Sequence, residues 1–122
     1  MATIMLVEDD ETMRSLLKIL LEIEGFTVAF NLETTVETIT NKILQSKPDG
    51  VMMDVHLKEV SGMAVLKNVR SDEKGKSIKI IMASGMDAKE ECLKTGADYF
   101  IMKPFNPEEL IKWLKKALNP AQ

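Results

Sequence analysis

The chain has 122 residues, of which 45% are hydrophobic, so it has the length of one domain and enough apolar side chains to form a core without disulfide or metal staples. Cys92 is the only cysteine, which excludes an internal disulfide and a thiolate metal cluster and predicts an inert core thiol. The net charge is -3 without any basic run, and the first apolar stretch is too short for a signal sequence or a membrane span. We therefore expect a cytoplasmic protein that contacts neither nucleic acid nor membrane directly.

Short apolar runs alternate with longer segments whose apolar residues recur at helical spacing, which predicts repeated strand–helix units. The strands are expected over residues 3–7, 26–30, 51–55, 78–83 and 99–102. The helices are expected over residues 11–24, 34–46, 63–70 and 87–95, and from Pro107 to near Asn119 and Pro120. Because the strands are nearly all apolar, we expect an α/β fold, a flavodoxin-like doubly wound (βα)5 domain with a five-stranded parallel sheet of order 2-1-3-4-5.

Helix-end residues and apolar stripes refine this expectation. Asp10 and Asn106 are placed to cap the first and the last helix. The first helix should turn one apolar face to the core, made of Met13, Leu16, Leu17, Leu20 and Leu21.

Charged and polar residues follow four of the five strands. They are Glu8, Asp9 and Asp10 after the first strand, Asp54 at the third, Ser84 after the fourth and Lys103 after the fifth. Ligands of open parallel sheets bind beyond the carboxyl ends of the strands, so these side chains should converge at one edge.

Crowded carboxylates repel one another unless a cation neutralises them, and an all-oxygen cluster suits a hard ion such as Mg²⁺. Mg²⁺ leaves coordination positions for phosphoryl oxygens, so the pattern favours phosphoryl transfer. Asp54 is the candidate nucleophile and would form an aspartyl phosphate. Lys103 and Ser84 would stabilise the phosphoryl charge, and Glu8 and Asp9 would hold the metal.

Each of these residues also has a purely structural interpretation. Acidic residues before a helix complement its dipole, and we assign Asp10 mainly to capping. Lys103 could end an exposed strand, and Ser84 could be a turn residue. Polar and charged residues occur together at the ends of several strands, and this joint pattern favours a functional site over separate structural roles.

These motifs, taken in order, resemble the response regulator receiver domain of two-component systems, the CheY-like group, over essentially the whole length. The residues that carry the resemblance are Met5-Leu6-Val7-Glu8-Asp9-Asp10, Asp54, Ala83-Ser84-Gly85, Gly96-Ala97-Asp98 and Lys103-Pro104-Phe105.

The resemblance implies that Asp54 accepts a phosphoryl group from the phosphohistidine of a sensor histidine kinase or a phosphotransfer protein. It implies Mg²⁺ as cofactor, with Asp9 and Asp54 as direct ligands, Glu8 acting through water and the main-chain carbonyl of His56 completing the set. It also implies a cis bond between Lys103 and Pro104.

A conformational switch follows from the same resemblance. A phosphoryl group on Asp54 would draw Ser84 toward it, and the Phe100 ring would fill the vacated space, which changes the surface of the fourth helix, fifth strand and fifth helix. Phe100 could equally be a constant core residue. Tyr99 and Trp113 are candidates for the changing surface or for ordinary packing.

Three positions depart from the family pattern. Lys58 stands where the family usually has proline, four residues after Asp54. His56 and Met86 occupy positions that can gate the attack of water on the acyl phosphate. His56 is either a solvent-exposed bystander or a modulator of dephosphorylation, and its ring has no metal role.

Two enzyme classes on the same sheet fit poorly. A haloacid-dehalogenase-like phosphatase needs a second aspartate two residues after its nucleophile, where this chain has His56. A flavin mononucleotide binder would present small residues rather than carboxylates after the first strand. A receiver-shaped interaction module that is never phosphorylated remains the alternative to the switch.

We therefore expect residues 1–122 to form a single receiver domain without an output domain. Its only chemistry would be its own phosphorylation and autodephosphorylation. A downstream protein is the expected further partner, and the domain would be a monomer or a phosphorylation-dependent dimer.

Overall fold

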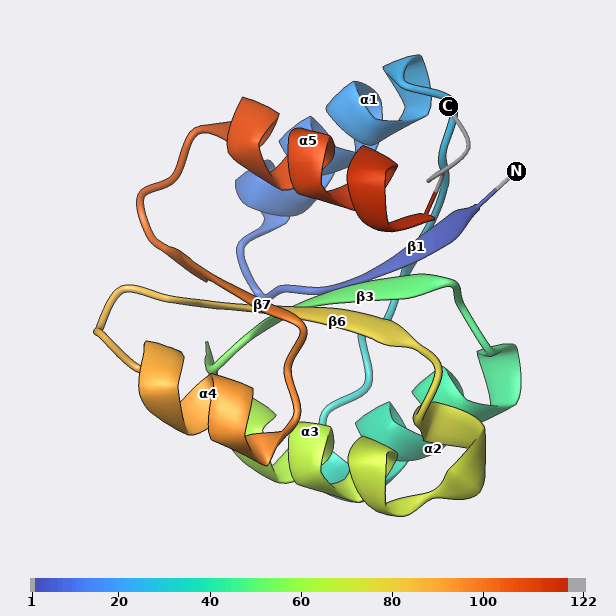
Figure 1. Cartoon of the computed structure of the whole chain (residues 1–122), viewed down its shortest axis with the longest axis vertical. Helices are drawn as coiled ribbons and strands as arrows, with labels where there is room; N and C mark the ends of the chain where they lie inside the picture. The colour runs from blue at the N-terminus through green and yellow to red at the C-terminus, as the bar shows by residue number, and fades with distance from the viewer. Residues whose placement is uncertain (1, 119–122) are drawn as a thin grey trace.

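A central parallel sheet organises the computed structural model, which describes residues 2–118 (Figure 1). Its strand order is β2-β1-β3-β6-β7, which is the predicted order 2-1-3-4-5 in other labels. The strands are β1 (Thr3–Val7), β2 (Thr27–Phe30), β3 (Gly50–Asp54), β6 (Lys79–Ser84) and β7 (Tyr99–Met102). The predicted doubly wound α/β fold is confirmed.

Helices cover both faces of the sheet. They are α1 (Glu11–Ile23), α2 (Val36–Ser46), α3 (Gly62–Ser71), α4 (Lys89–Thr95) and α5 (Pro107–Leu118). Figure 1 shows α1 and α5 on one face and the other three on the opposite face. The expected helix end near Asn119 and Pro120 lies outside the described residues, and within residues 2–118 no helix has the length and apolar content that crossing a bilayer requires.

Alternate residues of the central strands build two cores, one on each face of the sheet. In β1, Ile4 and Leu6 pack toward α1 and α5, whereas Met5 and Val7 pack toward α2, α3 and α4. All four are 2% exposed or less. This arrangement explains why the strands are continuous apolar runs, since neither face meets water.

The helix caps agree with the sequence in part. The Asp10 side chain accepts a hydrogen bond from the Met13 main-chain N at 3.1 Å, and the Asn106 side chain accepts one from Glu108 N at 2.9 Å. Both predicted caps are therefore confirmed. The second helix begins two residues later than expected, at Val36, because a capping box at Thr35 sets its start.

One core prediction is wrong. Leu16 is 44% exposed, although we expected it on the buried face of α1. Leu17 and Leu21 are fully buried at the centre of that face, and successive helix residues point about 100° apart, which turns Leu16 toward solvent. The helical spacing of apolar residues in α1 thus predicted a wider buried face than the sheet covers.

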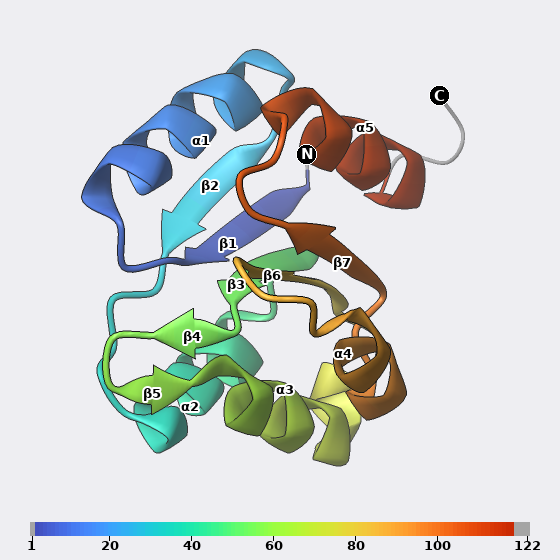
Figure 2. The same ribbon diagram turned by 90° about the vertical axis from the view of Figure 1, so that its left-hand side faces the viewer.

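A small hairpin that the sequence analysis missed follows Asp54. Strands β4 (His56–Leu57) and β5 (Val60–Ser61) pair antiparallel, below the main sheet in Figure 2. Gly62 then brings the chain back against β3, where an added Cβ would lie 2.1 Å from the Asp54 carbonyl oxygen. Only glycine allows this approach, so Gly62 fixes the hairpin beside the end of β3. A short 3-10 helix, η1 (Glu73–Gly75), follows α3.

Candidate functional site

The carboxyl ends of β1, β3, β6 and β7 meet at one edge of the sheet. Asp54 lies opposite Ala83 in the β3–β6 pair, and Ser84 lies opposite Met102 in the β6–β7 pair. The main-chain N of Lys103 donates to the Ser84 carbonyl oxygen at 2.8 Å. The convergence that the sequence predicted is therefore confirmed for Asp54, Ser84 and Lys103.

Lys103 joins two buried carboxylates at the centre of this edge. Its Nζ donates to Oε1 of Glu8 at 2.8 Å and to Oδ2 of Asp54 at 2.5 Å. Glu8 is 3% exposed and Asp54 is 8% exposed. Two carboxylates thus share one ammonium, and the local charge stays negative.

The pKa of Lys103 is raised above its ordinary value of 10.5. Burial by itself would lower this pKa, but hydrogen bonds to Asp54 and Glu8 and the charges of these carboxylates outweigh that effect. Lys103 is therefore a fixed positive charge at neutral pH. It can pair with a carboxylate or with a negatively charged group attached to one.

Ser84 and the Asp54 carboxylate are also held by main-chain donors. The fully buried Ser84 hydroxyl oxygen accepts from Met86 N at 3.0 Å. Oδ1 of Asp54 accepts from His56 N at 3.1 Å. The Lys103–Pro104 bond is cis, as the resemblance implied.

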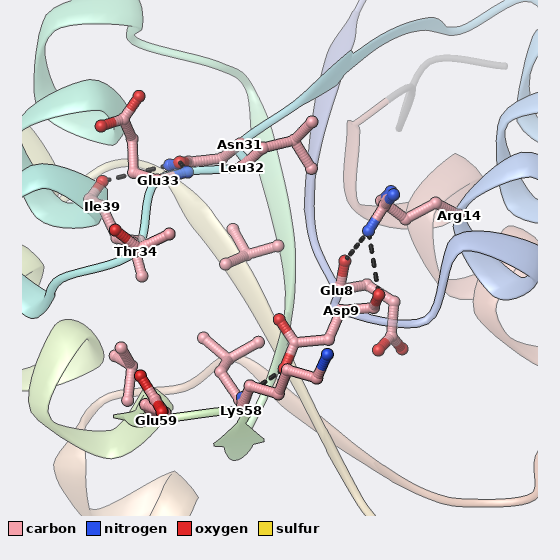
Figure 3. Close-up of a pocket in the computed structure, with 13 residues that line it drawn as sticks. Glu8, Asp9, Arg14, Asn31, Leu32, Glu33, Thr34, Ile39, Lys58 and Glu59 are labelled. Atoms are coloured by element: carbon pink, nitrogen blue, oxygen red, sulfur yellow. Dashed lines mark hydrogen bonds between the residues drawn. The ribbon is translucent and has the colours of Figure 1, made fainter.

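Asp9 bonds a different partner from Glu8 and Asp54. It is exposed, and its Oδ2 accepts a hydrogen bond from the main-chain N of Lys58, at the turn of the β4–β5 hairpin. Figure 3 shows this bond beside a pocket of about 350 Å³ that lies between the end of β1, the β2–α2 connection and the hairpin. The three candidate metal-binding carboxylates are thus divided between two partners.

Arg14 fixes the main chain that carries the two acidic residues. Its Nη1 donates to the carbonyl oxygens of Glu8 and Asp9 at 2.8 and 3.1 Å (Figure 3). Its guanidinium lies 5.6 Å from the centre of the Phe30 ring. The sequence alone did not predict this role of Arg14. A basic side chain in the first turn of a helix, where acidic residues are favourable, was the available indication.

The donor atoms at this edge suit the predicted metal by their chemistry. Glu8, Asp9 and Asp54 offer only oxygen atoms, which suits a hard cation such as Mg²⁺. Within residues 2–118, however, no three acidic, histidine or cysteine side chains stand together as a metal site, and Asp9 bonds the Lys58 main chain. The oxygen donors fit a hard cation by their chemistry, and the ligand roles of Asp9, Asp54 and His56 stay predictions.

The aromatic residues near β7 lie on opposite faces. Phe100 is 8% exposed and packs in the core on the α4 side. Tyr99 is half-buried on the other face, where its ring stacks on Trp113 with centres 5.2 Å apart and its hydroxyl donates to Glu109 at 2.7 Å. Tyr99 and Trp113 therefore pack against each other beside α5.

Three further predicted residues differ in their exposure to solvent. The His56 side chain is exposed, and Met86 is 67% exposed. The Cys92 thiol is fully buried in the core, and burial together with the nearby Glu91 charge raises its pKa to about 11. The prediction of a buried cysteine is confirmed.

Comparison with known proteins agrees with this geometry. A family model described as the response regulator receiver domain matches residues 4–115. The phosphate regulon transcriptional regulatory protein PhoB of Pseudomonas aeruginosa is 34% identical over 120 residues, which cover 96% of this chain and 52% of PhoB. The chemotaxis protein CheY of Bacillus subtilis is 30% identical, over 95% of this chain and 97% of CheY.

Among solved structures, the receiver domain of the sensor histidine kinase PA1611 of Pseudomonas aeruginosa superposes on this chain with a TM-score of 0.83. The match covers 97% of this chain and 98% of the PA1611 receiver domain. That protein holds a magnesium ion in its active site cleft, and at 23% identity the likeness shows the fold alone. The chain spans about half the length of the first curated relatives that it matches and nearly all of CheY. Since the family model covers most of its length, the chain belongs to the response regulator receiver domains of two-component signalling.

Proposed function

We propose that this chain is a phosphorylation-controlled switch in which Asp54 is the phosphoacceptor. The observation that carries the proposal is the Lys103 ammonium, which bonds the buried Asp54 carboxylate at 2.5 Å and Glu8 at 2.8 Å. A lysine held in this way is positioned to stay with Asp54 when a phosphoryl group adds negative charge to it.

The transfer follows from the same groups. An Asp54 carboxylate oxygen attacks the phosphorus of a phosphohistidine on the donor protein, a P–O bond forms, and the P–N bond breaks. The bonding electron pair returns to the imidazole nitrogen, so the donor histidine is regenerated. Lys103 and the Ser84 hydroxyl hydrogen-bond the phosphoryl oxygens. Bound Mg²⁺ would supply positive charge to these oxygens, with Asp9 and Asp54 as its side-chain ligands and Glu8 and the His56 carbonyl in support.

The output of the switch would be the surface of α4, β7 and α5. Ser84 is fully buried at the end of β6, and Phe100 is a buried core residue of the neighbouring strand β7. A phosphoryl group that recruits the Ser84 hydroxyl changes the packing next to Phe100, and the adjacent α4–β7–α5 surface changes with it. A sensor kinase or phosphotransfer protein would be the donor, and a downstream protein would read the changed surface.

Intact mass spectrometry after incubation with Mg²⁺ and acetyl phosphate tests the phosphoacceptor. The native chain should gain one phosphoryl group that base removes, and Asp54→Asn should gain none. Asp87→Asn is the matched control, since Asp87 is exposed in the β6–α4 connection, and it should keep the adduct. A native adduct that survives in Asp54→Asn contradicts the assignment. No adduct from either a kinase or acetyl phosphate favours the interaction module that is never phosphorylated.

The sole tryptophan gives a direct test of the surface change. Trp113 stacks on Tyr99, the neighbour of Phe100 in β7, so its fluorescence should change when the native chain is phosphorylated. Phe100→Leu should still gain the phosphoryl group but show a smaller fluorescence change. An equal change in both proteins would rule out Phe100 as the switch residue.

A further inference from the structure

The hydrogen bond between Asp9 and the β4–β5 hairpin has a consequence for the metal site. Oδ2 of Asp9 accepts from the main-chain N–H of Lys58, whereas Glu8 and Asp54 are bonded to Lys103. A cation that uses Asp9 and Asp54 together would draw on the same negative charge of the Asp9 carboxylate that this N–H now bonds. The hairpin and the cation therefore compete for the same carboxylate.

Few buried contacts hold the tip of the hairpin. Its strands have two residues each, Lys58 and Glu59 at the tip are exposed, and buried Leu57 is its main apolar anchor. The pocket of about 350 Å³ lies against the tip, between Lys58 and the β2–α2 connection. A short segment with few buried contacts opens at low free-energy cost, and the pocket gives it room.

The competing donor depends on which residue occupies position 58. Proline has no N–H, so a proline at position 58 could not make this bond. Leu57 pairs with Val60, which places Lys58 at the first central position of the turn. Among the described residues that are not glycine, only Lys47 has a positive φ, so Lys58 lacks the left-handed backbone that would exclude proline. Proline is favoured at the first central position of type I turns.

We propose that the Lys58 N–H is a latch that holds Asp9 in a cation-free orientation and lowers the affinity of the site for Mg²⁺. This inference rests on the proposed function, because it assumes that the acidic edge binds Mg²⁺. Binding of the cation frees the hairpin tip, and docking of the tip onto Asp9 disfavours the cation. A partner protein that holds the tip in its docked position therefore lowers the affinity of the site for Mg²⁺. By linkage, Mg²⁺ lowers the affinity for that partner by the same factor.

The test compares Mg²⁺ dissociation constants of the native chain, Lys58→Pro and Lys58→Ala by calorimetry. Lys58→Ala removes the ammonium but keeps the N–H, so the difference between the two variants isolates the main-chain donor. Lys58→Pro should bind Mg²⁺ about tenfold more tightly than Lys58→Ala, as expected for the loss of one hydrogen bond to a charged group. In the native chain, the NMR amide signal of Lys58 should shift upfield with the same midpoint as the calorimetric titration.

The outcomes separate the latch from the proposed function. If all three proteins bind Mg²⁺ with equal affinity, the latch is wrong and the proposed metal site stands. If none binds Mg²⁺, the latch and the metal site both fail. Should Lys58→Pro not fold, the native titration decides alone, since a Lys58 amide signal that stays unmoved at saturating Mg²⁺ overturns the latch.

Discussion

Replacement of Lys103 by methionine should destabilise the fold because it leaves Glu8 and Asp54 buried side by side without a counter-charge. Removing one member of a fully buried ion pair costs about 3–5 kcal/mol. The Lys103 side chain is 25% exposed, so solvent screens part of this cost. We therefore expect a loss of about 2–3 kcal/mol, which corresponds to a drop in melting temperature of roughly 10 °C for a domain of this size.

Urea unfolding at pH 7 in EDTA, followed by far-ultraviolet circular dichroism, measures the loss. A lysine with a raised pKa in the folded state stabilises fully below its unfolded-state pKa, and this stabilisation disappears as the pH rises through the folded-state pKa. Because the pKa of Lys103 is raised above 10.5, the native protein at pH 7 has this stabilisation in full. EDTA prevents a divalent cation from replacing the missing charge.

Two comparisons make the result specific. Lys112→Met, at an exposed lysine of α5, should cost less than about 0.5 kcal/mol. In an Asp54→Asn background the cost of Lys103→Met should fall by about 1 kcal/mol or more, because one of the two carboxylates has gone. An Lys103→Met variant as stable as the native chain, or an equal loss in both backgrounds, would refute the argument that Lys103 offsets carboxylate repulsion.

Three other predictions concern single positions. Gly62→Ala should lose about 2 kcal/mol or more in the same unfolding assay, because its Cβ meets the Asp54 backbone at 2.1 Å, whereas Gly85→Ala, with no atom within 4 Å, should lose little; equal losses would contradict this. Cys92 should stay unmodified by iodoacetamide at pH 8, since its pKa is about 11, and rapid alkylation of the folded chain would disprove its burial. The single tyrosine, Tyr99, has a pKa raised above 10.0 by its hydrogen bond to Glu109, by burial and by the Glu109 charge, so absorbance titration of Glu109→Gln should show a lower pKa than the native chain; an unchanged pKa would argue against that bond.

The order of strands and helices was predictable from sequence because it depends on local periodicity. The runs at residues 3–7 and 99–102 match β1 and β7 residue for residue. Apolar runs mark strands that are covered on both faces. Residues such as Asp10 mark helix ends, because their side chains bond a main-chain N–H only three positions further along the chain. Parallel order then placed Asp54, Ser84 and Lys103 at one edge before any contact was known.

The contacts within that edge required the tertiary structure. Lys103 lies 95 residues from Glu8 and 49 from Asp54 in the chain, and Asp9 lies 49 residues from Lys58. No local pattern says which of several neighbouring carboxylates a lysine will bond.

The hairpin after Asp54 was missed for a similar reason. Its strands of two residues are too short for a hydrophobic period, and its position depends on the contact of Gly62 with the β3 backbone. Leu16 looked like a core residue because helical spacing records which residues share a face, whereas the width of the covering sheet decides how much of that face is buried. The sequence alone thus predicted the strand order and placed Asp54, Ser84 and Lys103 at the carboxyl ends of the strands. The packing of distant segments decided that the Lys58 main chain bonds Asp9, whereas Lys103 bonds Glu8 and Asp54.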